Sequence, residues 1–168
     1  IVDRGAFKKT LRDNKGKFPI LSNHDPYMQI GWNLEGKEDD NGLWVRGELL
    51  VNDIPKAKEH FAIVRKAIEL KAKAGLSIGY SVIKAEPDKE NPTLRRLKEL
   101  RLYEYSPVTF PMNTEARVTN AKSALESIDL SESVLLLIES LREKGYSDIE
   151  IFETIDQHRQ SKDSSEDD

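Results

Sequence analysis

The sequence predicts an α+β protein in which a mostly antiparallel β body carries one long helix and precedes a helical hairpin. Three observations predict this fold. Short apolar runs end at Pro, Gly, Asn and Asp, which favour turns, so these runs indicate strands. One segment between them has apolar residues at helical spacing. Near the C-terminus, two capping boxes precede apolar residues and indicate helix starts.

The first expected strands lie before residue 52. Residues 17–22 form an apolar run that enters a turn, because Pro26 disfavours helix at the residue before it. A second strand is expected over residues 28–34. The sequence DDNG at residues 39–42 predicts a hairpin turn, since Asn-Gly adopts positive φ at low cost. An alternating strand over residues 43–51 is expected to follow.

The long helix is expected from about residue 54 to 74. Asn52 and Asp53 are expected to cap its start, Pro55 to lie in its first turn, and Gly75 to end it. Its apolar residues recur at helical spacing and form one face: Ala57, Phe61, Val64 and Ile68.

Two more strands are expected after this helix, over residues 76–85 and 94–105, with a polar stretch between them. The second strand is expected to continue past a kink at Pro107. Residues 116–124 have the composition of a linker, which ends the β body.

The C-terminal residues predict the helical hairpin. A capping box at residues 129–132 opens a helix that Gly145 closes, and a second box at residues 147–150 opens a shorter helix through Ile155. The residues after Gln160 are rich in Ser, Asp and Glu, so we expect a disordered tail. The expected parts are a body over residues 1–120, a helical segment over 121–160 and an acidic tail over 161–168.

Composition argues against several classes of protein. The chain has 168 residues, no cysteine and three histidines. Disulfides, thiolate zinc sites and a cysteine nucleophile are therefore excluded, and a multi-histidine metal site is not expected. No apolar run approaches the roughly 18 residues of a membrane span, so we expect no membrane protein. The chain opens with Ile1 rather than Met, so we expect a trimmed or processed product.

Charge is distributed unevenly along the chain. Residues 121–168 carry 5 Lys/Arg against 13 Asp/Glu, a net charge of −8, and the body carries the remaining +4. The body has no stripe of basic residues interleaved with aromatics, so nucleic-acid binding is not expected. The acidic segment predicts a different task, such as attachment to a basic surface.

Glu104 is the first candidate functional residue. It shares strand parity with Leu100 and Leu102, which predicts that it points inward. A buried carboxylate is costly unless a partner compensates it, so an inward Glu104 implies such a partner. The alternative is a register slip at Pro107 that leaves Glu104 at the surface.

Ser77 is the second candidate. It lies on a predicted strand face that contains only small residues, with Gly79 and Ser81, so a bound chain could approach its hydroxyl. The alternative is a small face that packs under the long helix. The sequence GLSIG is not the nucleophile elbow of α/β-hydrolases, because it starts a strand and does not link a strand to a helix.

His24 is the third candidate, because it lies where a strand enters a turn, a position suited to a general base. The alternative is an ordinary turn residue. His60 is expected on the solvated flank of the long helix and His158 in the acidic segment. Ser77, His24 and Glu104 together are the residue types of a Ser-His-acid triad.

Several segments, in order, resemble the prohead maturation proteases of tailed bacteriophages. They cover the chain from residue 1 to about residue 118. The matching segments are residues 2–7 (VDRGAF), 21–26 (LSNHDP), 42–47 (GLWVRG), 75–80 (GLSIGY) and 102–113 (LYEYSPVTFPMN), together with Gly31.

This resemblance implies a fold similar to the herpesvirus assemblins, a small closed β-barrel ringed by helices, here lacking an N-terminal strand. It implies Ser77 as nucleophile, His24 as general base and Glu104 as the acid that orients it, with no metal or cofactor. The implied activity is a serine endopeptidase that cleaves capsid and scaffold segments, and itself, during prohead maturation. The implied location is the procapsid in the host cytoplasm, and a homodimer is expected.

Two questions stay open at the sequence level. An inert phage assembly or scaffolding protein is the alternative to the enzyme. The oxyanion hole has two candidate sources, backbone N–H groups near Gly79 and a loop with Arg95 and Arg96.

Overall fold

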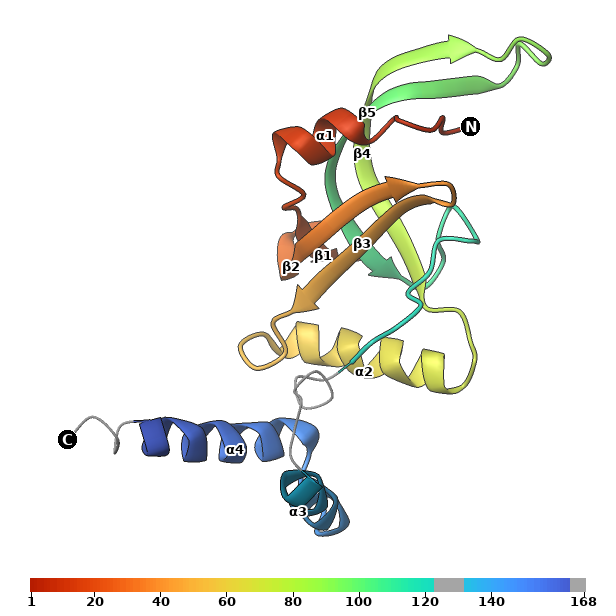
Figure 1. Cartoon of the computed structure of the whole chain (residues 1–168). Helices are drawn as coiled ribbons and strands as arrows, with labels where there is room; N and C mark the ends of the chain where they lie inside the picture. The colour runs from red at the N-terminus through yellow and green to blue at the C-terminus, as the bar shows by residue number, and fades with distance from the viewer. Residues whose placement is uncertain (123–131, 164–168) are drawn as a thin grey trace. The chain divides into compact units, whose positions relative to one another are not determined.

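The computed structural model describes residues 1–122 and 132–163. It divides the chain into two units, Ile1–Asn120 and Ala121–Asp168. The first unit is a mixed α+β body built on one five-stranded sheet, and the described part of the second contains helices α3 and α4 (Figure 1). No helix in the described residues is long and apolar enough to cross a membrane.

The sheet has the strand order β3-β2-β1-β5-β4. Strands β1 and β5 run parallel, and each other neighbouring pair is antiparallel. Closure into a barrel requires the two edge strands to pair, and β3 and β4 do not pair in the described chain. The sheet is therefore not closed into a barrel, and the barrel expected from the sequence is not confirmed. The strands are β1 (Pro19–Ser22), β2 (Asp25–Asp39), β3 (Gly42–Leu49), β4 (Gly75–Pro87) and β5 (Arg95–Val108).

The strands lie where the sequence predicts them, and β2 and β4 are longer than expected. The predicted turn between β2 and β3 is confirmed, because Asp39 pairs with Gly42 and Gly42 has a φ of +125°. Strand β5 continues through Pro107 as one strand. The first residues of the expected linker are bonded to the body, because Val118 N–H donates to Ala74 O at 2.8 Å, beside the start of β4.

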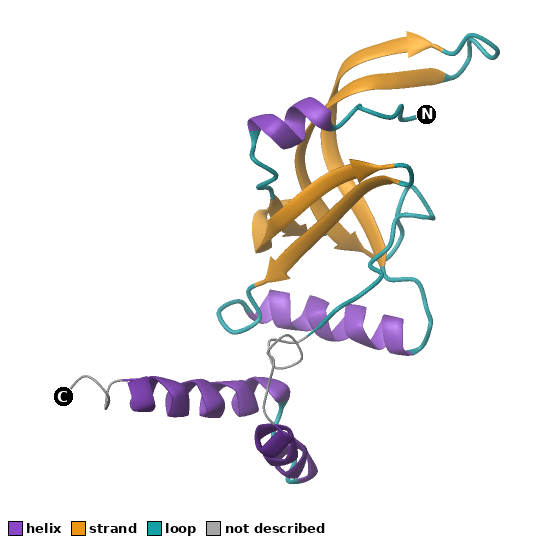
Figure 2. Ribbon diagram, viewed as in Figure 1, coloured by secondary structure: helices purple, strands orange, loops and turns teal. Residues whose placement is uncertain are grey.

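The long helix is α2, Pro55–Glu69, which is shorter than predicted (Figure 2). Its predicted apolar face is confirmed, with Ala57 and Val64 buried. Pro55 begins the helix, but no side chain caps it, so the predicted cap is wrong. The helix ends before Gly75 because Lys71 adopts a φ of +56°. Ala72 N–H then donates to Ala67 O, and this bond closes the last turn.

A second helix of the body, α1 (Lys8–Asp13), was not predicted. Six residues are too few for the hydrophobic period of a helix to show in the sequence. The residues just before α1, Ala6 and Phe7, form a small core with Leu100 of β5.

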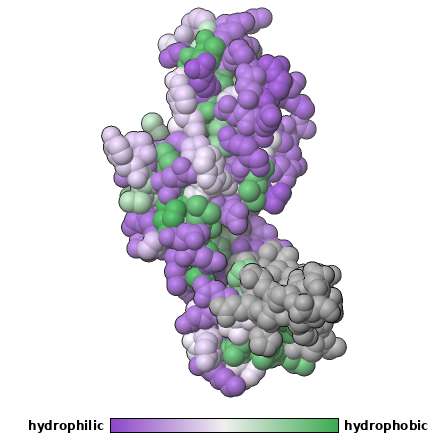
Figure 3. All heavy atoms as spheres, turned by 90° about the vertical axis from the view of Figure 1, so that its left-hand side faces the viewer, coloured by the Kyte–Doolittle hydropathy of each residue, from purple (hydrophilic) through white to green (hydrophobic). Residues whose placement is uncertain are grey.

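The main core lies between the sheet and α2. It contains Ile20 of β1, Ile30 of β2, Ala57 of α2 and Tyr105 of β5. The Tyr105 hydroxyl donates to Asn33 Oδ1 at 3.1 Å, and burial raises the pKa of Tyr105. The face of the body shown in Figure 3 is mostly hydrophilic, with hydrophobic residues in small separate patches.

The second unit contains α3 (Glu132–Glu143) and α4 (Asp148–Asp163). Gly145 ends α3 with a φ of +88°, as predicted. The capping box that opens α4 is confirmed, because Ser147 N–H donates to Glu150 Oε2 at 2.7 Å. The other predicted box, at residues 129–132, lies mostly outside the described residues. Helix α4 extends beyond Ile155 and Gln160, so the helix is longer than predicted.

Candidate active site

His24 lies in the two-residue turn that joins β1 to β2. Ser22 pairs with Asp25, so Asn23 and His24 are the two turn residues. Both have positive φ, +51° and +63°, which is the conformation of a type I′ hairpin turn. Histidine adopts positive φ infrequently, so the surrounding contacts must hold it there. The predicted end of a strand at this histidine is confirmed.

A register shift in the β4–β5 pair places Glu104. Tyr80 pairs with Leu102 and Gly79 pairs with Glu104, so Tyr103 is an extra residue between these pairs. Such a bulge reverses the alternation of side chains. Glu104 therefore lies on the face opposite Leu102, and the parity that predicted its inward orientation does not hold. Its burial is confirmed nonetheless, because the residue is only 7% exposed.

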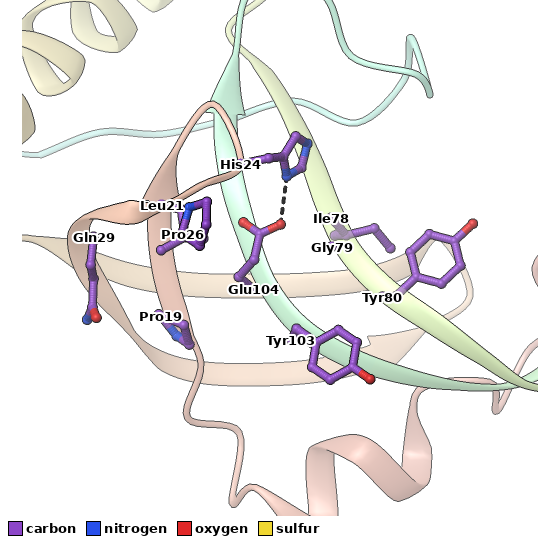
Figure 4. Close-up of a pocket in the computed structure, with 10 residues that line it drawn as sticks. All are labelled: Pro19, Leu21, His24, Pro26, Gln29, Ile78, Gly79, Tyr80, Tyr103 and Glu104. Atoms are coloured by element: carbon purple, nitrogen blue, oxygen red, sulfur yellow. Dashed lines mark hydrogen bonds and ion pairs between the residues drawn. The ribbon is translucent and has the colours of Figure 1, made fainter.

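His24 and Glu104 are in direct contact. The Nδ1 atom of His24 lies 2.6 Å from Glu104 Oε1, although the two residues are 80 positions apart in the chain (Figure 4). A carboxylate only accepts hydrogen bonds, so Nδ1 carries the hydrogen and Nε2 is left as the free nitrogen. The side chain of His24 is 40% exposed and that of Glu104 is 9% exposed, so a solvent-facing imidazole rests on a buried carboxylate.

Ser106 connects the same two residues and is fully buried. Its hydroxyl donates to Glu104 Oε2 at 2.7 Å. The Oγ atom of Ser106 also accepts the backbone N–H of His24 at 3.0 Å. Ser106 thus fixes the second oxygen of the carboxylate and the backbone of the strained turn. No pattern of apolar or turn residues distinguishes Ser106 in the sequence, because its role depends on the register shift at Tyr103.

Ser77 lies on the same face of β4 as Gly79, because the two residues are two positions apart on one strand. Ser77 pairs with Ser106, and Gly79 pairs with Glu104, so the hydroxyl of Ser77 is on the face that carries Glu104. In the part of the chain that is described, Ser77 forms no hydrogen bond with His24. A β-carbon at residue 79 would collide with the carboxylate of Glu104, so glycine is required there.

A serine–histidine contact also joins β1 to α2. Ser22 Oγ is 2.8 Å from Nε2 of His60, which lies on α2. Ser22 is buried, and burial together with the nearby Lys56 lowers the pKa of His60. His60 is therefore neutral near pH 7, and its Nε2 forms a hydrogen bond with the Ser22 hydroxyl. The expectation that His60 is merely solvated is wrong.

A pocket of about 670 Å³ opens beside His24 and Glu104 (Figure 4). Strands β1, β2, β4 and β5 and the β1–β2 turn supply its lining: Pro19, Leu21, His24, Pro26, Gln29, Ile78, Gly79, Tyr80, Tyr103 and Glu104. No group of His, Asp and Glu side chains in the described residues is arranged to hold a metal ion.

The sequence profile of the caudovirus prohead serine protease family matches residues 1–131, which is most of the chain. The chain belongs to this family. Family membership supports a role as a serine protease in capsid maturation, and it implies a place in the phage procapsid within the host. No curated protein and no solved structure matches the chain.

One of the two oxyanion-hole candidates does not lie where the sequence predicts it. Arg95 and Arg96 begin strand β5 and do not form a loop. Arg96 forms ion pairs with Asp3 and Asp88. It is eight residues before Glu104 on the same strand, or about 26 Å at the rise of a β-strand. The other candidate, backbone N–H groups near Gly79, stays a prediction.

Proposed function

We propose that this chain is a serine endopeptidase with Ser77 as nucleophile, His24 as general base and Glu104 as the acid that orients His24. The observation that carries the proposal is the 2.6 Å contact between His24 and the buried carboxylate of Glu104. A buried carboxylate on Nδ1 selects the tautomer whose Nε2 accepts a proton, which is what a general base requires.

The proposed reaction is acyl transfer. His24 Nε2 takes the hydroxyl proton of Ser77 as Oγ attacks a peptide carbonyl, and Glu104 stabilises the imidazolium that forms. The imidazolium returns the proton to the leaving amine. A water molecule, deprotonated by His24, then hydrolyses the acyl-enzyme. No step requires a metal or a cofactor. The absence of a Ser77–His24 hydrogen bond fits a resting site, because such contacts often tighten only when substrate binds.

The proposed substrates are segments of the major capsid protein and the scaffold, and the chain itself.

The apolar residues of α3 include Val134, Leu141 and the buried Ile138, which pack against α4, whereas Leu135 to Leu137 are about half exposed. The exposed leucines supply a surface for the proposed homodimer.

Ser22 is a second candidate nucleophile, because it already contacts a histidine at 2.8 Å. Two observations favour Ser77. Ser22 is buried, so a peptide carbonyl cannot reach it, and His60 hydrogen bonds to no carboxylate among the described residues. An inert assembly protein is the third possibility, and it predicts that neither serine reacts.

A fluorophosphonate probe separates these possibilities, because it reacts only with an activated serine. The full chain and its Ser77→Ala and Ser22→Ala variants would be labelled, digested and mapped by mass spectrometry. We expect the probe on Ser77 in the native chain and in Ser22→Ala, and no labelling of Ser77→Ala. Labelling of Ser22, or a folded chain that never labels, would contradict the proposal.

A further inference from the structure

We propose that the pocket beside His24 is a subsite for an apolar side chain of the peptide substrate, close to the bond that is cleaved. This inference rests on the proposed function, since it requires a substrate that reaches His24. It adds the chemistry that the substrate must present, which no sequence motif specifies.

The lining of the pocket is mostly apolar. Six of its ten lining residues are proline, aliphatic or aromatic: Pro19, Leu21, Pro26, Ile78, Tyr80 and Tyr103. Tyr80 and Tyr103 remain 42% and 51% exposed, so the fold leaves apolar area uncovered at this position. Burying such area against a substrate side chain is favourable in proportion to the area removed from water.

The ionisable groups of the pocket are already paired. Its lining contains no lysine, arginine or aspartate, and His24 and Glu104 bond to each other. The second carboxylate oxygen of Glu104 accepts the Ser106 hydroxyl. Gln29 directs its amide N–H group to Gly31 O at 3.2 Å. A charged substrate side chain would lose water here and find no unpaired counter-ion among the lining residues, so it is disfavoured.

The bulge that places Glu104 also places one wall of the pocket. Tyr103 is the extra residue of the bulge, and its hydroxyl lies 3.1 Å from Ser81 Oγ on the neighbouring strand. One irregularity of β5 therefore turns the carboxylate toward His24 and sets an aromatic ring beside it. The base and the subsite are built from adjacent residues, which places a bound side chain next to the reacting atoms.

Binding to the full-length Ser77→Ala chain tests the pocket without turnover. N-acetyl-leucine amide, N-acetyl-aspartate amide and N-acetyl-lysine amide would be titrated and followed by NMR of the tyrosine rings. We expect the leucine compound to bind at least about tenfold more tightly than either charged compound. Adding Tyr103→Ala or Tyr80→Ala should remove most of this difference, and adding Tyr27→Ala should retain it. Tyr27 is a matched control because it is 94% exposed and does not line the pocket.

Equal binding of the three compounds, or equal losses with Tyr27→Ala and Tyr103→Ala, would overturn the proposal. Cleavage of a randomised peptide library by the native chain gives a second readout, with an apolar preference expected at one position beside the cleaved bond. Tyr103→Arg should shift that preference toward acidic residues.

The two proposals fail separately: a chain that binds the leucine compound but never labels at Ser77 contradicts the proposed nucleophile alone. A labelled chain without the leucine preference contradicts the subsite alone.

Discussion

The two serine–histidine regions of the body have complementary deficiencies. His24 is exposed at a pocket and bonds to a buried carboxylate, but the proposed nucleophile Ser77 is not hydrogen bonded to it. His60 bonds to Ser22 at 2.8 Å, but that serine is buried and no carboxylate orients the ring in the described structure. A serine–histidine distance alone would select Ser22 and His60 instead of the proposed pair. Access for a substrate and an acid on the far nitrogen are the more informative criteria.

The largest expected effect separates the two serines. Ser77→Ala should lower the cleavage rate by roughly 10⁶-fold, because a triad acts as a unit. The stability of Ser77→Ala should change little, since the substitution removes one hydroxyl from a face of small residues. Ser22→Ala should retain most activity. Cleavage of a capsid-derived or self-derived peptide, with thermal unfolding as the check on folding, measures both effects.

His24→Ala is the companion variant for that comparison. It should lose about as much activity as Ser77→Ala, and the double variant should lose no more than either single variant. Appreciable cleavage by Ser77→Ala, or additive losses in the double variant, would mean that Ser77 and His24 do not form one catalytic unit.

The two regions also show what the sequence can predict. The strands around His24 and the turn that carries it follow from local patterns of apolar and turn residues. The His60 contact does not, because it joins α2 to a serine 38 positions away, and only packing determines that pairing. The parity of Glu104 failed for a similar reason. A one-residue bulge at Tyr103 leaves no mark in the apolar pattern, yet it reverses the face of every residue beyond it.

Glu104 supplies the second largest effect. Glu104→Gln retains the shape of the side chain but removes the charge that stabilises the imidazolium, so kcat should fall by roughly 10⁴-fold with residual activity. Glu104→Ala should in addition lower the free energy of unfolding by about 1–3 kcal/mol, because Ser106 loses its acceptor. Steady-state kinetics and denaturant unfolding measure the two effects. Activity of Glu104→Gln equal to that of the native chain would remove Glu104 from the proposed mechanism.

Ser106 tests whether the buried network positions His24. Ser106→Ala removes the hydroxyl that donates to Glu104 and accepts the backbone N–H of His24, so the imidazole should lose its alignment. We expect a loss of roughly 10- to 100-fold in kcat with KM little changed. Ser140→Ala, in the second unit of the chain, is the control for a serine-to-alanine change. A KM effect without a kcat effect would show that Ser106 acts on substrate binding and not on His24.

His60 should give the smallest effect on catalysis. Ser22 precedes the strained turn by one residue, and its bond to His60 ties the base of that turn to α2. Loss of this bond in His60→Ala should cost about 0.5–1.5 kcal/mol of stability and lower kcat only several-fold. Lys66→Ala, an exposed change on the same helix, should leave both quantities unchanged.

The acid side of the stability profile distinguishes His60 from a passive packing residue. Burial lowers the pKa of His60 in the folded chain below its ordinary value of 6.5, so the unfolded chain takes up the proton first as the pH falls. Stability is therefore retained above pH 6.5 and declines as the pH falls through 6.5 toward the lower folded value. His60→Asn has no group that titrates in this range, so its free energy of unfolding should fall less steeply between pH 6.5 and that value. Parallel profiles for the native chain and His60→Asn would show that His60 is not held neutral by the fold.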